Sequence, residues 1–225
     1  MCGRYSLISN LQDLENRFEF TNEFIPHGSR FNIAPSQPVL SITNNGSNNQ
    51  AHMMRWGLIP HWSKDAKITS ALINARAETL DQKVSFREPF LTKRCIIPAD
   101  GFYEWTRKDN KKIPMRITLK SEELFGFAGL WENWVADNAT QFSTCTIITT
   151  RANQLISPIH HRMPVILPRE SEHIWLDPTN QDLKTLKGLL TQYTSDDMAT
   201  YPVSTLVNSP ENDSSDVIAM WQTIS

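Results

Sequence analysis

The feature of this sequence that most constrains its fold is a series of strand-length segments rich in β-branched and aromatic residues. Five follow one another in the central part of the chain: Arg94–Ile97, Gly101–Thr106, Pro114–Leu119, Leu124–Trp131 and Gln141–Thr150. Upstream, Val39–Thr43 and Met53–Leu58 flank the polar turn Asn44–Asn49, a pattern typical of a β-hairpin. Because consecutive hairpins pair their strands antiparallel, we predict a largely antiparallel, barrel-like β core.

Helical patterns occur only near the two ends of the chain. Leu11–Phe18 is predicted as a short helix, opened by a capping box between Ser9 and Gln12. Apolar residues at helical spacing return in Glu170–Leu176 and Gln181–Leu190. We therefore expect an α+β fold whose helices lie at the periphery of the β core.

The length of the chain and the absence of repeats favour one domain. The 225 residues are enough for one well-buried core, and no internal linker is long enough to divide them, so a single domain is predicted over residues 1–225. Residues 208–216 are polar and contain Pro210 and acidic residues. We expect this segment to be mobile.

Composition indicates the cellular compartment of the protein and limits the kinds of partner that it can bind. The three cysteines are odd in number and lack CxxC spacing, which argues against a disulfide framework and favours a reducing compartment. Cys95 and Cys145 lie in apolar runs and are expected to be buried, inert thiols. No signal peptide or membrane span is evident, so a cytoplasmic monomer without a membrane partner is expected. The net charge of −2 requires any nucleic-acid site to be a local basic patch.

The second residue carries the most distinctive chemistry. The chain begins Met1-Cys2-Gly3, and removal of Met1 would leave Cys2 with both a thiol and a free α-amine. Their ordinary pKa values, about 8.5 and about 7.7–8.0, make both groups partly reactive at neutral pH. Such an aminothiol condenses with an aldehyde to an imine, and the adjacent thiol closes a thiazolidine ring. The alternative is a chance Met-Cys start, with Cys2 acting only as a small apolar residue.

Three further motifs place polar groups beside apolar or aromatic residues. Asn74 and Arg76 lie in an apolar stretch, Glu104 stands between Tyr103 and Trp105, and His160 and His161 precede Arg162. A carboxyl group placed between aromatic residues suits proton transfer. Each motif also has a structural alternative: a helix cap, an exposed strand position, or an ordinary structural histidine.

At these residues the chain resembles the SOS-response-associated peptidase (SRAP) family of abasic-site-processing proteins. The resemblance covers nearly the whole chain and rests on six motifs in register: Met1–Tyr5, Phe31–Pro35, Arg55–Pro60 with Trp62, Ile73–Glu78, Pro98–Trp105 and Ile159–Pro164. It implies a DNA damage (SOS) response protein that recognises abasic sites in single-stranded DNA. It also implies a lyase-like crosslinking activity, in which Cys2 joins the sugar aldehyde in a thiazolidine, and an autoproteolytic release of the residue before Cys2.

The resemblance assigns catalytic roles to four residues. Cys2 is the nucleophile, Asn74 orients it, Glu104 shuttles protons, and His160 assists opening of the cyclic sugar. We expect alternation along an extended segment to point His161 to the side opposite His160.

The resemblance also implies a DNA surface. Arginines would contact phosphates and tryptophans would stack on bases, while the remaining members would wedge against the backbone. The residues concerned are Arg4, Asn32, Pro35, Trp62, Arg76, Trp105, Thr149 and Arg162. Four other tryptophans are expected to be packing residues: Trp56, Trp131, Trp175 and Trp221.

Two alternatives remain open on the residues themselves. Cys2, His160 and Asn74 form a papain-like set for a cysteine or N-terminal-nucleophile peptidase, although such an enzyme needs no free α-amine. Cys2, Glu104, His160 and His161 offer ligand types that suit zinc. Their spacing matches no metal motif, so neither a metal nor a cofactor is expected.

Overall fold

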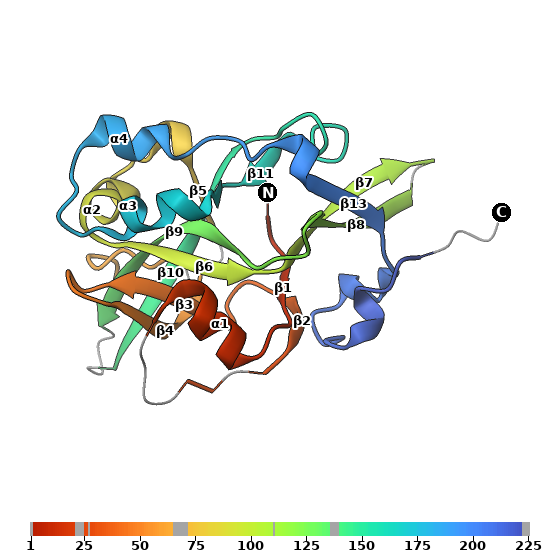
Figure 1. Cartoon of the computed structure of the whole chain (residues 1–225), viewed down its shortest axis with the longest axis horizontal. Coiled ribbons are helices and arrows are strands. Elements are labelled where there is room, and N and C mark those ends of the chain that lie inside the picture. Colours follow the sequence, from red (N-terminus) through yellow and green to blue (C-terminus); the bar gives the residue numbers. More distant parts are fainter. Residues whose placement is uncertain are drawn as a thin grey trace.

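A closed five-stranded barrel lies at the centre of the computed structural model, which describes residues 2–20, 25–26, 28–64, 72–109, 111–135 and 140–221. Its strands follow the order β10-β4-β3-β6-β9, and pairing of β9 with β10 closes it. The strands are β3 (Pro38–Asn44), β4 (Asn49–Trp56), β6 (Arg94–Ala99), β9 (Phe125–Val135) and β10 (Gln141–Arg151). The barrel and its helices form the larger part of the molecule in Figure 1.

Most strand pairs are antiparallel, as the sequence predicts. The exceptions among the described strands are the parallel pairs that β10 makes with β4 and with β5 (Asn74–Arg76). Two short strands, β11 (Arg162–Pro164) and β12 (Ile166–Leu167), extend the sheet beyond β10 and β9. The prediction of an α+β domain with a largely antiparallel, barrel-like core is therefore confirmed.

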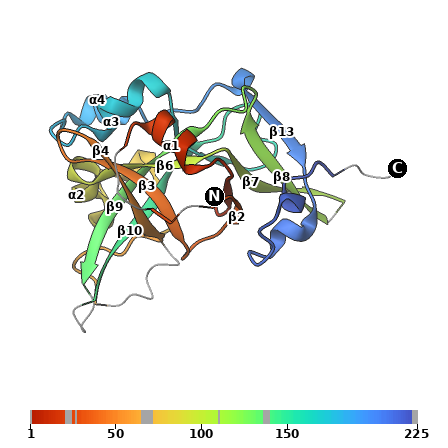
Figure 2. The ribbon, with the colours of Figure 1, turned by 60° about the horizontal axis from the view of Figure 1, so that its bottom comes forward.

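A second sheet of five strands stands beside the barrel, in the order β13-β8-β7-β1-β2. Its strands are β1 (Tyr5–Leu7), β2 (Arg30–Ile33), β7 (Gly101–Lys108), β8 (Lys111–Leu119) and β13 (Met198–Pro202). The chain passes from the barrel into this sheet where β6 is followed by β7. A Cβ atom on Gly101 would lie 2.9 Å from the Arg116 guanidinium, so this crossing point favours glycine. Figure 2 shows the β7–β8 hairpin projecting to one side of the barrel.

The helices are short and peripheral. They are α1 (Leu11–Phe18), α2 (Val84–Thr92), α3 (Glu172–Leu176) and α4 (Leu183–Gly188), with short 3-10 turns at Ala77–Thr79, Arg169–Ser171, Ser195–Asp197, Thr205–Asn208 and Ser215–Val217. The bounds of α1 agree with the prediction, but its cap does not. Asn10 accepts a hydrogen bond from the Asp13 amide at 3.0 Å and caps the helix in place of Ser9.

A single apolar cluster joins both sheets. The buried ring of Tyr5 lies between them, with centroids 5.4 Å from Trp56 of the barrel and 5.8 Å from Phe127. Cys95 and Cys145 are fully buried, as expected. Strand β1 is thereby packed against the barrel, which fixes the position of the chain that leads into it from Cys2.

The tryptophans expected to pack do so with one exception. Trp56 and Trp175 are fully buried, and Trp131 packs against the main cluster. Trp221, however, is 45% exposed, so its prediction as a packing residue is wrong. It follows β13 at the C-terminal end of the described chain, beyond the apolar core.

Hydrogen bonds tie the polar segment near the C-terminus to β2. The Asp213 carboxylate accepts from the backbone amides of Phe31 and Asn32 and pairs with Arg30. These contacts oppose the mobility predicted for residues 208–216, which stays a prediction. Within the described ranges, the structure contains no helix with the length and apolar character needed to cross a membrane.

Candidate active site at the N-terminal cysteine

Cys2 lies between the barrel and the second sheet. The chain from Cys2 runs alongside β7, where the Tyr103 amide donates to the Arg4 carbonyl at 2.9 Å. The side chain of Cys2 is fully buried, and its thiol lies 3.9 Å from the same carbonyl oxygen. Burial raises the pKa of the Cys2 thiol, and the nearby Glu104 charge raises it further. The thiol is therefore protonated at neutral pH and must lose its proton to a base when it reacts.

Asn74 holds the backbone of Cys2. It begins β5, whose parallel pairing with β10 places Asn74 opposite Ile147. Its Nδ2 donates to the Cys2 carbonyl oxygen at 2.8 Å. The structure thus brings together two residues that are 72 positions apart, in the arrangement needed for an orienting amide.

Glu104 approaches the same place from β7. Because side chains alternate along a strand, Glu104 shares the inner face of β7 with the fully buried Phe102. Glu104 is 4% exposed, and its Oε1 lies 3.9 Å from Nδ1 of His160. The carboxyl group, the imidazole and the thiol therefore come from three separate segments that meet beside β1.

His160 is oriented by the backbone that follows it. The Arg162 amide nitrogen and the Arg162 carbonyl oxygen each lie 3.0 Å from His160 Nδ1, so the backbone of Arg162 holds this ring nitrogen in place. The ring of His161 lies at 4.3 Å between centroids and is tilted by 33°. The prediction that His161 points to the opposite side is wrong, because residues 160 and 161 lie outside regular strand structure, in a bend before β11. The charge of His160 lowers the pKa of His161.

Arg162 is committed to partners within the protein. It is 7% exposed and forms two hydrogen bonds to the Glu78 carboxylate, at 2.6 and 2.9 Å. It also donates to the carbonyl and the hydroxyl of the buried Thr149. The guanidinium holds the pKa of Glu78 below its usual value. This bidentate pair was not visible in the sequence because its members lie 84 positions apart.

Arg4, Asn32 and Trp105 form a connected group on the other side of β1. Arg4 donates to Asn32 Oδ1 at 2.8 Å and to the Val207 carbonyl, and its guanidinium lies 5.9 Å from the Trp105 ring centroid. Asn32 is fully buried, whereas Trp105 is half-buried. These bonds join the start of the chain to its C-terminal part, so the group positions the region around Cys2.

Among the residues expected to bind DNA, Arg76 and Trp62 are exposed and Pro35 is half-buried. Trp62 is 53% exposed although its loop is firmly attached. His61 Nδ1 lies 3.1 Å from the buried Glu132 carboxylate, and Trp134 donates its indole N–H to the Ser63 carbonyl at 2.7 Å. These contacts hold the residues on either side of Trp62, whose own side chain is exposed.

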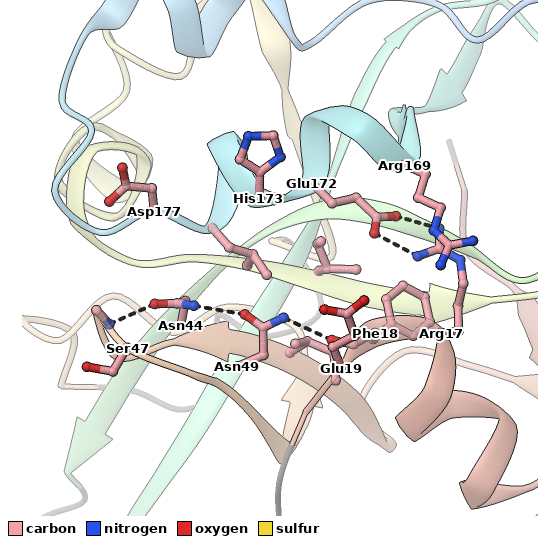
Figure 3. A pocket seen from close by; sticks show the side chains of 14 residues that line it. Arg17, Phe18, Glu19, Asn44, Ser47, Asn49, Arg169, Glu172, His173 and Asp177 are labelled. Carbon is pink, nitrogen blue, oxygen red and sulfur yellow. Dashed lines mark hydrogen bonds and ion pairs between the residues drawn. The ribbon is translucent and has the colours of Figure 1, made fainter.

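A polar pocket lies elsewhere on the barrel, and none of its lining residues belongs to the predicted site. The cavity has a volume of about 490 Å³. It lies between α1, the β3–β4 turn and α3, as Figure 3 shows. The Arg17 guanidinium forms a bidentate pair with Glu172 at its edge, with both hydrogen bonds at 2.8 Å. Burial raises the pKa of Glu172 in spite of this partner. The pocket is a structural feature separate from the group around Cys2.

In the described part of the chain, no three His, Cys, Asp or Glu side chains are grouped so as to hold a metal ion.

Comparison with known proteins bears on this arrangement. The profile of a family described as "SOS response associated peptidase (SRAP)" matches residues 1–210. The chain belongs to the SRAP family. One relative, the abasic site processing protein YoqW of Bacillus subtilis, is 54% identical over 222 residues, which cover 97% of this chain and 99% of YoqW.

More distant relatives show the same relationship. The abasic site processing protein HMCES of Gallus gallus is 36% identical in an alignment of 188 positions, and the match covers 71% of this chain and 54% of HMCES. The crystal structure of a protein from Bacteroides thetaiotaomicron superposes with a TM-score of 0.90 at 29% identity, covering 98% of this chain and all of that one. The fold of this SRAP chain is thus shared over nearly its full length.

The different environments of Arg76 and Arg162 give a testable contrast. Arg76→Ala is expected to lower the log–log salt slope of single-stranded DNA binding by about 0.7, because one phosphate contact is lost. Arg162→Ala is expected to lower the melting temperature, because it removes the partner of Glu78 and the donor to Thr149. Arg87→Ala, on the exposed face of α2, is the matched control. Equal slopes for Arg76→Ala and Arg87→Ala would contradict a phosphate contact at Arg76.

Proposed function

We propose that this protein senses abasic sites in single-stranded DNA and couples Cys2 to the sugar aldehyde, which forms a covalent crosslink that shields the lesion. The observation that carries the proposal is the convergence of an amide, a carboxyl group and an imidazole on the chain at Cys2. The names of the relatives support it, since both YoqW and HMCES are described as abasic site processing proteins. The protein is expected to act as a cytoplasmic monomer.

The proposed reaction begins with the closed sugar. His160 assists transfer of the hemiacetal proton to the ring oxygen, which opens the ring and exposes the aldehyde. The α-amine of Cys2 then adds to the aldehyde carbon. Glu104 takes a proton from the attacking nitrogen and delivers one to the departing hydroxyl, so that an imine and one water are formed.

Ring closure follows without a second encounter. The Cys2 sulfur adds to the imine carbon, and the thiol proton passes to the imine nitrogen, which gives a thiazolidine with no further leaving group. Because burial raises the pKa of the thiol, the amine is the better nucleophile at neutral pH and attacks first. Asn74 keeps the backbone of Cys2 in register with the aldehyde throughout.

The α-amine of Cys2 is available only after cleavage of the Met1–Cys2 bond. We include this cleavage in the proposed function, either by the same site acting on its own chain or by a separate aminopeptidase. The chemistry favours crosslinking over peptidase activity on other proteins, because an aminothiol is needed for a thiazolidine and not for peptide hydrolysis.

Intact-mass analysis tests the proposal directly. The purified protein is expected to lack Met1, and after incubation with an abasic oligonucleotide its mass is expected to rise by that of the oligonucleotide minus one water. An oligonucleotide with a tetrahydrofuran in place of the abasic sugar is the control, because it has no aldehyde and should give no adduct. A chain that retains Met1 and still forms the adduct would contradict the role of the α-amine.

A further inference from the structure

A groove lies at the outer end of the β7–β8 hairpin, against the C-terminal part of the described chain. Its volume is about 990 Å³, and its lining includes Arg107, Lys111, Lys112, Ile113, Met115 and Trp221. We call it the hairpin groove. Figure 1 shows strands β7, β8 and β13 together on one side of the molecule. The reaction proposed at Cys2 does not use this groove.

Part of the lining of the hairpin groove lies on the same face of the hairpin as Glu104. In the register of β7 and β8, Met115 lies directly opposite Glu104 and Ile113 opposite Thr106. Directly opposed residues project from the same face of a sheet, so Met115, Ile113 and Lys111 lie on the face that carries Glu104. Arg107 and Lys112 oppose each other and project from the other face of the hairpin. Lys111 pairs with residue 108, which is four residues beyond Glu104. At about 3.3 Å per residue this is roughly 13 Å along the strand, the length of about four stacked nucleotides.

The charge of the groove differs from that of the whole chain. Arg107, Lys111 and Lys112 contribute three cations, and Asp109 is the one acidic residue in the lining, whereas the chain has a net charge of −2. All three cationic residues are exposed. The groove is therefore a local basic patch of the kind that a phosphate backbone requires.

The apolar part of the groove suits an unpaired base. Trp221 is 45% exposed and is held by a hydrogen bond from its backbone amide to the Pro202 carbonyl at 2.9 Å. Ile113 and Met115 add apolar surface beside it. Exposed aromatic rings beside cations bind single-stranded nucleic acid with little sequence preference, because every base has a face that can stack.

We propose that the hairpin groove binds the single-stranded DNA that flanks the abasic site on one side. Trp221 stacks on a base, while Lys111 and Lys112 contact phosphates. This inference rests on the proposed function, which identifies the bound strand as abasic single-stranded DNA. It adds the direction in which that strand leaves the reacting sugar. Affinity from this groove would hold the lesion in place without touching the reacting atoms.

Two variants test the groove: Lys111→Ala/Lys112→Ala and Trp221→Ala. Three abasic oligonucleotides are compared: one with a single nucleotide on each side, and two extended by about eight nucleotides on the 5′ or the 3′ side. For the wild type, one extension is expected to increase affinity and the other not. In each variant that increase should fall about 10-fold, and the double lysine variant should lose about 1.4 from the log–log salt slope. Crosslinking of the short oligonucleotide should be unchanged.

Lys120→Ala/Lys184→Ala is the matched control, because it removes two exposed lysines outside the groove. Trp221→Phe should retain most of the affinity, since a ring for stacking remains. The inference is overturned if folded groove variants match this control on all three oligonucleotides, or if they lose crosslinking of the short one. Binding of unmodified single strands of the short and the extended lengths is measured in parallel. This measurement tests the groove even if the wild type forms no crosslink. Failure of the wild type to crosslink would contradict the proposed function and not the groove.

Discussion

Replacing Cys2 by alanine is expected to abolish the stable adduct with abasic DNA. The Cys2→Ala protein keeps an α-amine after removal of Met1, so it still forms an imine with the aldehyde, but an imine hydrolyses readily. Without sulfur the thiazolidine cannot close. Cys2→Ser is expected to give an imine that borohydride traps, and no heat-stable product. Denaturing electrophoresis with and without borohydride distinguishes the imine from the thiazolidine.

The other cysteines provide the control. Cys95 and Cys145 are fully buried inside the barrel, and burial raises the pKa of both thiols. Cys95→Ala is therefore expected to leave the yield of adduct unchanged, at some cost in stability from the cavity that it creates. If Cys2→Ala forms a heat-stable adduct at the wild-type rate, the nucleophile lies elsewhere in the chain.

Much of the fold follows from local sequence patterns. The helix Leu11–Phe18 and the hairpin around Asn44–Asn49 are where alternation, helical spacing and turn residues place them. Closure of the barrel is a different matter. It depends on parallel pairing of β10 with β4 and on the pairing of β10 with β9, and no local pattern specifies which distant strand becomes a neighbour.

The misses have physical reasons too. Helix α2 contains Pro89 and begins with the β-branched Val84, both of which weaken a helical prediction. Packing of Phe86 and Phe90 against the core compensates for this low propensity. Trp221 looked like a core residue because tryptophan usually is one, but it lies beyond the last strand and is 45% exposed.

The candidate site divides in the same way. The residue types at Cys2, Asn74, Glu104 and His160 were available from motifs, whereas their supporting partners were not. Glu78 and Glu132 act through residues 84 and 71 positions away, and only the folded chain brings such pairs together. Glu78 holds Arg162 within the protein, and Glu132 holds His61, the neighbour of Trp62.

Glu104→Gln is expected to slow crosslinking by a factor on the order of 10²–10⁴ without weakening DNA binding, the usual range for loss of a general acid–base group. Glutamine keeps the size of the side chain and removes its ability to exchange a proton. His160→Gln should behave differently. Because His160 is assigned to opening of the sugar, its loss should slow formation and reversal together and leave the final crosslinked fraction nearly unchanged. Rates and yields are measured on one abasic oligonucleotide, with an aldehyde trap to follow reversal.

Proton transfer by Glu104 and the charge of Glu104 have opposite expected effects on the rate of crosslinking. The negative charge of Glu104 raises the pKa of the Cys2 thiol, so Glu104→Gln should lower that pKa and increase the thiolate fraction at a given pH. Charge alone would thus make the variant faster. Iodoacetamide labelling of Cys2 across pH should show this lowered pKa in the same protein that crosslinks slowly. A variant that is folded, binds DNA and crosslinks at or above the wild-type rate would refute the proton-transfer role. If the melting temperature, DNA binding and activity of the variant all decrease together, Glu104 instead contributes to the stability of the fold.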